Sequence, residues 1–140
     1  MILIPWKDQY SVQVKEIDEQ HKKLLIIINQ LYEAIKSQSS HKNLVTLVKE
    51  LIDFSEYHFT TEEKYFDLCN YEDKEPHKKE HQKFKEKILT TYNTCRSSEC
   101  QGQELEIAFE LIDFMEDWFV EHFISMDQKY IPCFKKYGLK

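Results

Sequence analysis

Glycine and proline, the residues that most often turn a chain or break a helix, are scarce: two glycines and three prolines occur in 140 residues. Leu, Ile, Glu, Lys and Gln, which favour helix, are common instead. This length suits a single domain with its own hydrophobic core. The composition therefore predicts one all-α domain over residues 1–140.

Long apolar runs and an excess of positive charge are also missing. The longest strongly apolar run, residues 24–28, is far too short to span a membrane, and residues 1–5 are too few for a signal sequence. The net charge is −6, and lysines alternate with glutamates over residues 78–87. That pattern is typical of a solvated helix face. We therefore expect neither a membrane nor a nucleic-acid partner.

Paired cysteine motifs are absent as well. None of the four cysteines belongs to a Cys-x2-Cys pair; they are Cys69, Cys95, Cys100 and Cys133. This spacing suits reduced thiols in a cytoplasmic protein better than a disulfide framework or a thiolate zinc site. Cys95 and Cys100 flank a predicted loop and are candidates for redox activity, with free thiols as the simpler interpretation.

Four stretches of the chain carry apolar residues at the three- and four-residue steps of a helix packed in a bundle. They cover residues 17–35, 44–69, 76–91 and 105–126. Polar breaks separate them at residues 37–42, 70–75 and 93–102. Residues 1–16 have no such period and indicate an extended N-terminal arm, and a short tail with Pro132 and Gly138 follows the last stretch. The short connections favour an up-down-up-down antiparallel four-helix bundle.

Five of the six histidines lie on the apolar faces of these predicted helices: His21, His58, His77, His81 and His122. In an antiparallel bundle, the starts of the first and third helices lie beside the ends of the second and fourth. All five histidines are therefore predicted to converge at one end of the core. A single histidine on an apolar face is usually a satisfied core residue. Five unpaired imidazoles, however, would each cost about 1–3 kcal/mol, and a bound metal would remove that cost.

The donor set indicates two metal ions, because five imidazoles exceed what one tetrahedral zinc uses. Two neighbouring ions need bridging anions, and Glu62, four residues after His58, faces the core as one candidate. Asp127 follows His122 by five residues, an offset that turns about 140° on a regular α-helix. We therefore predict an irregularity between them, either a widened π-type turn or a helix that ends near Ser125, without which Asp127 is a surface acid. Mixed imidazole and carboxylate ligands favour iron over manganese or zinc.

Taken together, these motifs resemble the hemerythrins, especially their bacterial single-domain members. The resemblance covers essentially the whole chain and rests on Pro5-Trp6, Ile17-Asp18-x-Gln20-His21, His58-x3-Glu62, His77-x3-His81 and His122-x4-Asp127. It implies that His77, His81 and His122 hold one iron ion, and that His21 and His58 hold the other. Glu62 and Asp127 would bridge the two ions (Fe2+/Fe3+) together with a solvent-derived oxo or hydroxo group.

The resemblance also implies a function: reversible dioxygen binding, for storage, transport or delivery, at the iron held by two histidines. The wall of the dioxygen pocket would comprise Leu24, Phe59, Trp118, Phe119 and Phe123. Phe119 and Phe123 are bulkier than the aliphatic residues expected at such a wall. No acid or base beyond the ligands is evident there, so an enzyme is not expected.

Two alternative functions remain open on the sequence. One is an enzyme that turns over peroxide or nitric oxide at the same centre. The other is an oxygen or redox sensor that acts through a separate partner protein. The sequence identifies no reductase or delivery partner.

Overall fold

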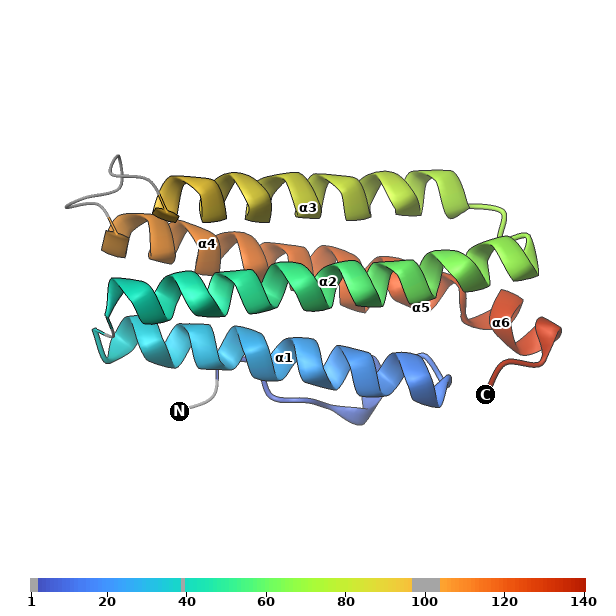
Figure 1. Cartoon of the computed structure of the whole chain (residues 1–140). Helices are drawn as coiled ribbons and strands as arrows, with labels where there is room; N and C mark the ends of the chain where they lie inside the picture. Colours follow the sequence, from blue (N-terminus) through green and yellow to red (C-terminus); the bar gives the residue numbers. More distant parts are fainter. Residues whose placement is uncertain (1–2, 39, 97–103) are drawn as a thin grey trace.

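The computed structural model describes residues 3–38, 40–96 and 104–140 (Figure 1). Its four long helices are α1 (Lys15–Lys36), α2 (His41–Cys69), α3 (Lys74–Arg96) and α4 (Glu104–Trp118). Successive helices run in opposite directions, and α1 packs against α2 and α4 while α3 packs against the same two neighbours. The predicted up-down-up-down four-helix bundle is therefore confirmed.

The fourth helix continues beyond α4 in a changed form. A π-helical segment, η3 (Phe119–Met126), leads into the single turn α5 (Asp127–Lys129) and then into α6 (Ile131–Tyr137). Helix α6 packs across the end of α2 (Figure 1). It ends at Gly138, whose φ of 99° is a left-handed conformation that glycine adopts without strain. The tail predicted after residue 126 is thus mostly helical.

The N-terminal arm is extended apart from one 3-10 turn, η1 (Asp8–Tyr10). Its start is tied to α1, where the Asn29 side chain exchanges two hydrogen bonds of 2.9 Å with the backbone of Ile4. Its end is tied to Asp18, which accepts hydrogen bonds from the Ser11 hydroxyl and the Val12 amide. An acid in the first turn of α1 therefore anchors the arm, as well as suiting the positive end of the helix.

Helix α3 is longer than predicted at both ends. It begins at Lys74, two residues before Pro76, because the amides of a helix's first turn have no partner within the helix and a proline there costs little. It runs to Arg96, past the polar residues from Asn93 that were expected to end it. The remaining residues of that predicted break, 97–102, lie outside the described part of the chain, and so does Cys100.

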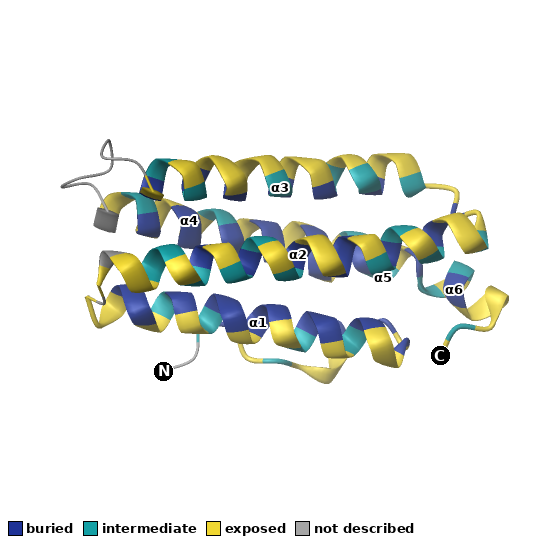
Figure 2. Ribbon diagram, viewed as in Figure 1, coloured by how far each residue is buried: buried dark blue, intermediate teal, exposed yellow. Residues whose placement is uncertain are grey.

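The buried residues line the inside of the bundle and form two apolar clusters (Figure 2). The larger cluster fills most of the bundle and includes Leu24, Phe59 and Phe123. The smaller one lies where α6 meets the end of α2, and includes Phe66 and Phe134. On α1 the smaller cluster includes Ile17 and the larger one Leu24, and on α2 the larger one includes Phe59 and the smaller one Phe66. The two clusters therefore leave a level between them on both helices.

In the described residues, no helix is both long enough and apolar enough to cross a membrane.

Candidate metal centre

Seven side chains with metal-binding atoms meet at the level between the two apolar clusters. They are His21, His58, Glu62, His77, His81, His122 and Asp127, and each is at most 1% exposed. They come from α1, α2, α3, η3 and α5. The structure therefore brings together all five histidines and both carboxylates, at one end of the bundle, as the antiparallel arrangement predicted.

The seven residues fall into two groups that share one member. The donor atoms of Glu62, His77, His81 and His122 lie within 4.8 Å of one another, and so do those of His21, His58, Glu62 and Asp127. Each group therefore has the size and the composition of a site for one cation. Glu62 belongs to both groups.

Asp127 reaches imidazoles of both groups through its two oxygens. Its Oδ1 lies 3.0 Å from Nε2 of both His77 and His122, and its Oδ2 lies 3.2 Å from Nε2 of His21. The π-helical segment makes this possible, because the Asp127 amide donates to the carbonyl of His122, five residues earlier. The wider turn brings Asp127 onto the face that carries His122. The predicted irregularity between these two residues is confirmed.

Glu62 spans the groups in the same way. Its Oε1 lies 3.1 Å from Nε2 of His81 and 3.4 Å from Nε2 of His58, and its Oε2 lies 3.7 Å from Nε2 of His21. Oε2 also accepts a hydrogen bond from the Tyr130 hydroxyl at 2.5 Å. Both carboxylates thus stand between the two sets of histidines, where a bridge between two cations would be needed.

Two polar side chains outside the cluster orient the histidines of α2 and α3. The Nδ1 of His58 donates to Oε1 of Gln20 at 2.8 Å, and the Nδ1 of His81 donates to Oε2 of Glu63 at 2.9 Å. Gln20 is itself held by Thr61, which accepts from its Nε2 at 3.2 Å. With Nδ1 as the donor, each ring presents the lone pair of Nε2 to the cluster, as a metal ligand requires.

Sequence reasoning did not identify these outer partners. Gln20 and Glu63 were visible only as neighbours of a predicted ligand in the chain, and nothing in the helical period marks a residue that hydrogen-bonds to a ligand on another helix. Tyr130 follows Asp127 by three residues, a spacing that places both on one side of a helix. That spacing is the signal that could have found it.

The charged states of the metal-free cluster follow from its burial and its two carboxylates. Burial lowers the pKa of His21, but the neighbouring Asp127 and Glu62 carboxylates outweigh it and raise the pKa to about 9. Burial lowers the pKa of His58. For Glu62 and Asp127 burial acts to raise the pKa, yet the surrounding histidines bring it well below the usual value for each. Both carboxylates are therefore ionised at neutral pH, and binding of a cation would release the proton that His21 carries.

A metal fits this cluster because most of its donor atoms have no other partner. Buried atoms without a hydrogen bond include Nε2 of His21, His58 and His81, Oε1 of Glu62, and both oxygens of Asp127. The Nε2 atoms of His77 and His122 face one another at 3.1 Å. Unpaired buried polar atoms are rare in native proteins, and so many at one place indicate a bound group that satisfies them.

Aromatic rings enclose the cluster on its inner side. Phe59 stacks on His81 with 4.0 Å between ring centroids, and Trp118 stacks on His122 with 4.4 Å. The ring centroid of Phe123 lies 4.1 Å from that of His21. Phe119 packs behind Phe123 at 5.2 Å, and Leu24 is buried in the same apolar cluster. All five residues predicted for a pocket wall are therefore buried, and Phe59, Trp118 and Phe123 contact histidines of the cluster.

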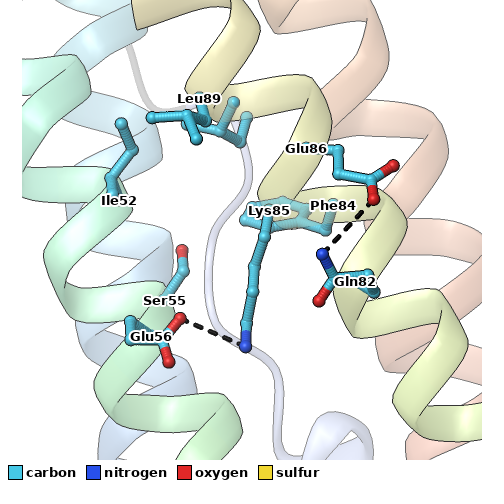
Figure 3. Close-up of a pocket in the computed structure, with 9 residues that line it drawn as sticks. Ile52, Ser55, Glu56, Gln82, Phe84, Lys85, Glu86 and Leu89 are labelled. Atoms are coloured by element: carbon cyan, nitrogen blue, oxygen red, sulfur yellow. Dashed lines mark hydrogen bonds and ion pairs between the residues drawn. The ribbon is translucent and has the colours of Figure 1, made fainter.

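A separate hollow of about 250 Å³ opens between α2 and α3 (Figure 3). Lys85 crosses it and forms an ion pair with Glu56, with Nζ 3.1 Å from the carboxylate oxygen. The residues that line it include Ser55 and Phe84 but none of the seven donors. Phe84, which lines the hollow, contacts Phe59 of the aromatic wall, with 5.4 Å between ring centroids.

Comparison with known proteins identifies the fold and the cluster. The family model described as "Hemerythrin HHE cation binding domain" matches residues 12–134, which include all seven donors. The chain belongs to the hemerythrin family. A hemerythrin domain binds a di-iron centre, and the buried histidine and carboxylate cluster is able to hold one.

Individual hemerythrins cover nearly the whole chain. A bacteriohemerythrin of Clostridium acetobutylicum is 30% identical over 90% of this chain and 97% of its own length. Myohemerythrin-1 of Phascolopsis gouldii is 30% identical over 89% of each chain. A crystal structure of wild-type hemerythrin superposes with a TM-score of 0.82 at 25% identity, covering 94% of this chain and 97% of the other.

Proposed function

We propose that this hemerythrin binds dioxygen reversibly at a di-iron centre and stores, carries or delivers it in the cytoplasm. The observation that supports the proposal most is the pair of buried donor groups that share Glu62, with Asp127 also facing both. Two cations held this close, with carboxylates between them, can act together on one ligand. The relatives named bacteriohemerythrin and myohemerythrin support the same function.

The ligand roles that we propose follow the two groups. His77, His81 and His122 would hold one ion, His21 and His58 would hold the other, and Glu62 and Asp127 would bridge them. When bound, the di-iron centre would supply two electrons and a position for dioxygen. The group with His21 and His58 has one imidazole fewer, so we assign dioxygen binding to that side.

The protein's own contribution is a dry and closed surrounding for that open position. Phe123 covers the His21 ring at 4.1 Å, and Leu24, one turn after His21, is 1% exposed. Gln20 keeps the His58 ring in one orientation, because its Oε1 accepts a hydrogen bond from Nδ1 of His58. Apolar walls keep water from the cluster, which favours release of dioxygen over loss of a reduced oxygen species.

The direct test is iron analysis and a visible spectrum on purified protein. Two irons per chain are expected, with a colour that appears when the reduced protein meets dioxygen and disappears when dioxygen is removed. Continuous oxygen consumption with a reductant, without a stable coloured adduct, would instead indicate an enzyme.

Variants test where dioxygen binds. His21→Ala and His58→Ala are expected to reduce dioxygen binding more than they reduce total iron, since the three-histidine group stays intact. The control is His41→Ala, at the opposite end of α2 from the cluster. Normal dioxygen binding by both variants would show that the open position lies elsewhere.

A further inference from the structure

We propose that Cys69 and Cys133 form a reversible disulfide that joins the end of α2 to α6. The two residues are 64 positions apart in the sequence, yet the Cys133 thiol donates to the carbonyl oxygen of Cys69 at 3.6 Å. The Cys133 thiol also lies near enough to the Cys69 thiol to raise its pKa. Helix α6 packs across the end of α2 (Figure 1), so the fold itself brings the two segments that carry these cysteines together.

Small oxidants can reach both thiols. Cys69 and Cys133 are each partly exposed, and both line an open cleft of about 650 Å³ at this end of the molecule. Tyr137, on the same cleft, is 53% exposed. Cys95, by contrast, is buried. The sequence favoured free thiols and singled out Cys95 and Cys100 as redox candidates, whereas the structure directs attention to the other two cysteines.

The chemistry balances with hydrogen peroxide as the oxidant. The Cys133 sulfur attacks peroxide, breaks its O–O bond and becomes a sulfenic acid, with one water released. The Cys69 sulfur then attacks the sulfenic sulfur, loses its proton and forms the S–S bond, and a second water leaves. The two thiols lose two electrons, and the peroxide gains them. A dithiol reductant reverses the reaction by thiol–disulfide exchange.

The order of the two steps follows from the surroundings of Cys69. Burial and the nearby Cys133 thiol raise the pKa of Cys69 to about 11. Cys69 is thus protonated at neutral pH, and a protonated thiol is a poor nucleophile toward peroxide. It is better placed as the second thiol, which acts only after Cys133 has been oxidised next to it.

The disulfide would restrain the C-terminal segment that covers the metal cluster at the α6 end of the bundle. Helix α6 carries Phe134, which stacks on Tyr130 at 4.2 Å and packs against Phe66 of α2. Tyr130 in turn donates to Glu62. A disulfide at Cys133 would therefore hold this aromatic cover in place and limit its opening. The proposal does not depend on dioxygen binding.

The test uses the full, iron-loaded chain. Reduced protein is treated with hydrogen peroxide, remaining thiols are alkylated, and peptides are analysed by mass spectrometry without reduction. A cross-linked peptide pair containing Cys69 and Cys133 is expected, which disappears after dithiothreitol. The thermal midpoint of the oxidised protein is expected to rise by about 5 °C, because the bond closes a long loop.

Matched variants decide whether the pair is specific. Cys95→Ser/Cys100→Ser should keep both the cross-link and the shift in midpoint, whereas Cys69→Ser and Cys133→Ser should each lose both. Diamide, an oxidant that forms disulfides without peroxide, should give the same cross-link in the iron-loaded protein. If Cys69 and Cys133 stay alkylatable after both oxidants, or if they pair only with Cys95, Cys100 or a second chain, the proposal is wrong.

Discussion

The hydroxyl of Tyr130 donates a 2.5 Å hydrogen bond to Oε2 of Glu62, and both side chains are fully buried. Burial, together with the charges of Glu62 and Asp127, raises the pKa of Tyr130 well above its usual value, so the phenol remains a donor. The carboxylate that belongs to both donor groups is therefore oriented by a residue outside the bundle's four long helices. This contact connects the C-terminal segment to the metal cluster.

Replacing Tyr130 by Phe keeps the ring and removes the hydroxyl. The variant is expected to lose about 1–3 kcal/mol of unfolding free energy, because a buried carboxylate oxygen loses its only neutral donor. Urea unfolding of the iron-loaded protein measures this loss. Tyr71→Phe, a change at a neighbouring buried tyrosine of the same apolar cluster, is the control and should have a smaller effect. Equal losses in the two variants would contradict a specific role for the Tyr130 hydroxyl.

Replacing Glu62 by Ala should remove both metal ions rather than one, since its carboxylate faces histidines of both groups. Metal analysis after gel filtration is expected to find well below one iron per chain. Two tightly held irons in this variant would refute the bridging role.

The adjacent Glu63 provides the matched comparison, because it contacts only the outer nitrogen of His81. Glu63→Ala should keep both irons but bind them about 10–100-fold more weakly, the usual effect of losing an outer partner of a ligand. Competition with a chelator measures the difference. Loss of both irons at once would place Glu63 among the ligands instead.

Phe123 is predicted to protect bound dioxygen, since its ring covers His21 at 4.1 Å. Phe123→Leu makes room for water beside that histidine and should shorten the lifetime of the oxygenated colour several-fold, at a cost of about 1 kcal/mol in stability. The decay of the visible spectrum in air measures the lifetime. Phe114→Leu, a change on α4 away from the seven donors, should leave the lifetime unchanged. An unaltered lifetime in Phe123→Leu would show that its ring does not control access.

A pH dependence is expected where α1 meets α2. The Tyr65 hydroxyl donates to Glu16 at 2.6 Å, and this hydrogen bond raises the pKa of Tyr65 from 10.0 to about 12. Because the folded-state pKa is the higher one, the stabilisation is complete below pH 10 and disappears as the pH rises toward 12. The difference in tyrosinate absorbance between the wild type and Tyr65→Phe isolates this group during an alkaline titration. In Glu16→Gln the group should titrate near its usual pKa; an unchanged titration would assign the shift to another cause.

The helices and the donor cluster could be predicted because both depend on periodicity. Five histidines on apolar faces, at alternating ends of antiparallel helices, have to meet at one level. An irregularity between His122 and Asp127 could also be predicted, because a regular helix would turn Asp127 away from His122 by about 140°. A buried site for two cations needs anions, and this requirement pointed to the irregular turn.

The remaining contacts could not be predicted, because they join segments whose relative position follows from the fold alone. Cys133 lies in a tail with no clear period, and only the packing of α6 across the end of α2 brings it to Cys69. Gln20 and Glu63 look like ordinary polar neighbours of a ligand. The late end of α3 depends on tertiary packing, which keeps Cys95 buried beyond the polar Asn93.

The π-helical segment sets the rotational phase of everything that follows it. It holds one more residue than a regular helical turn would, so winding the same residues as a regular α-helix, with none deleted, would rotate the downstream chain by about 100°. Asp127 would then turn away from His122, and Tyr130 and Phe134 would leave the faces on which they now pack. A local widening of the helix thus determines the alignment of the entire C-terminal segment with the end of the bundle.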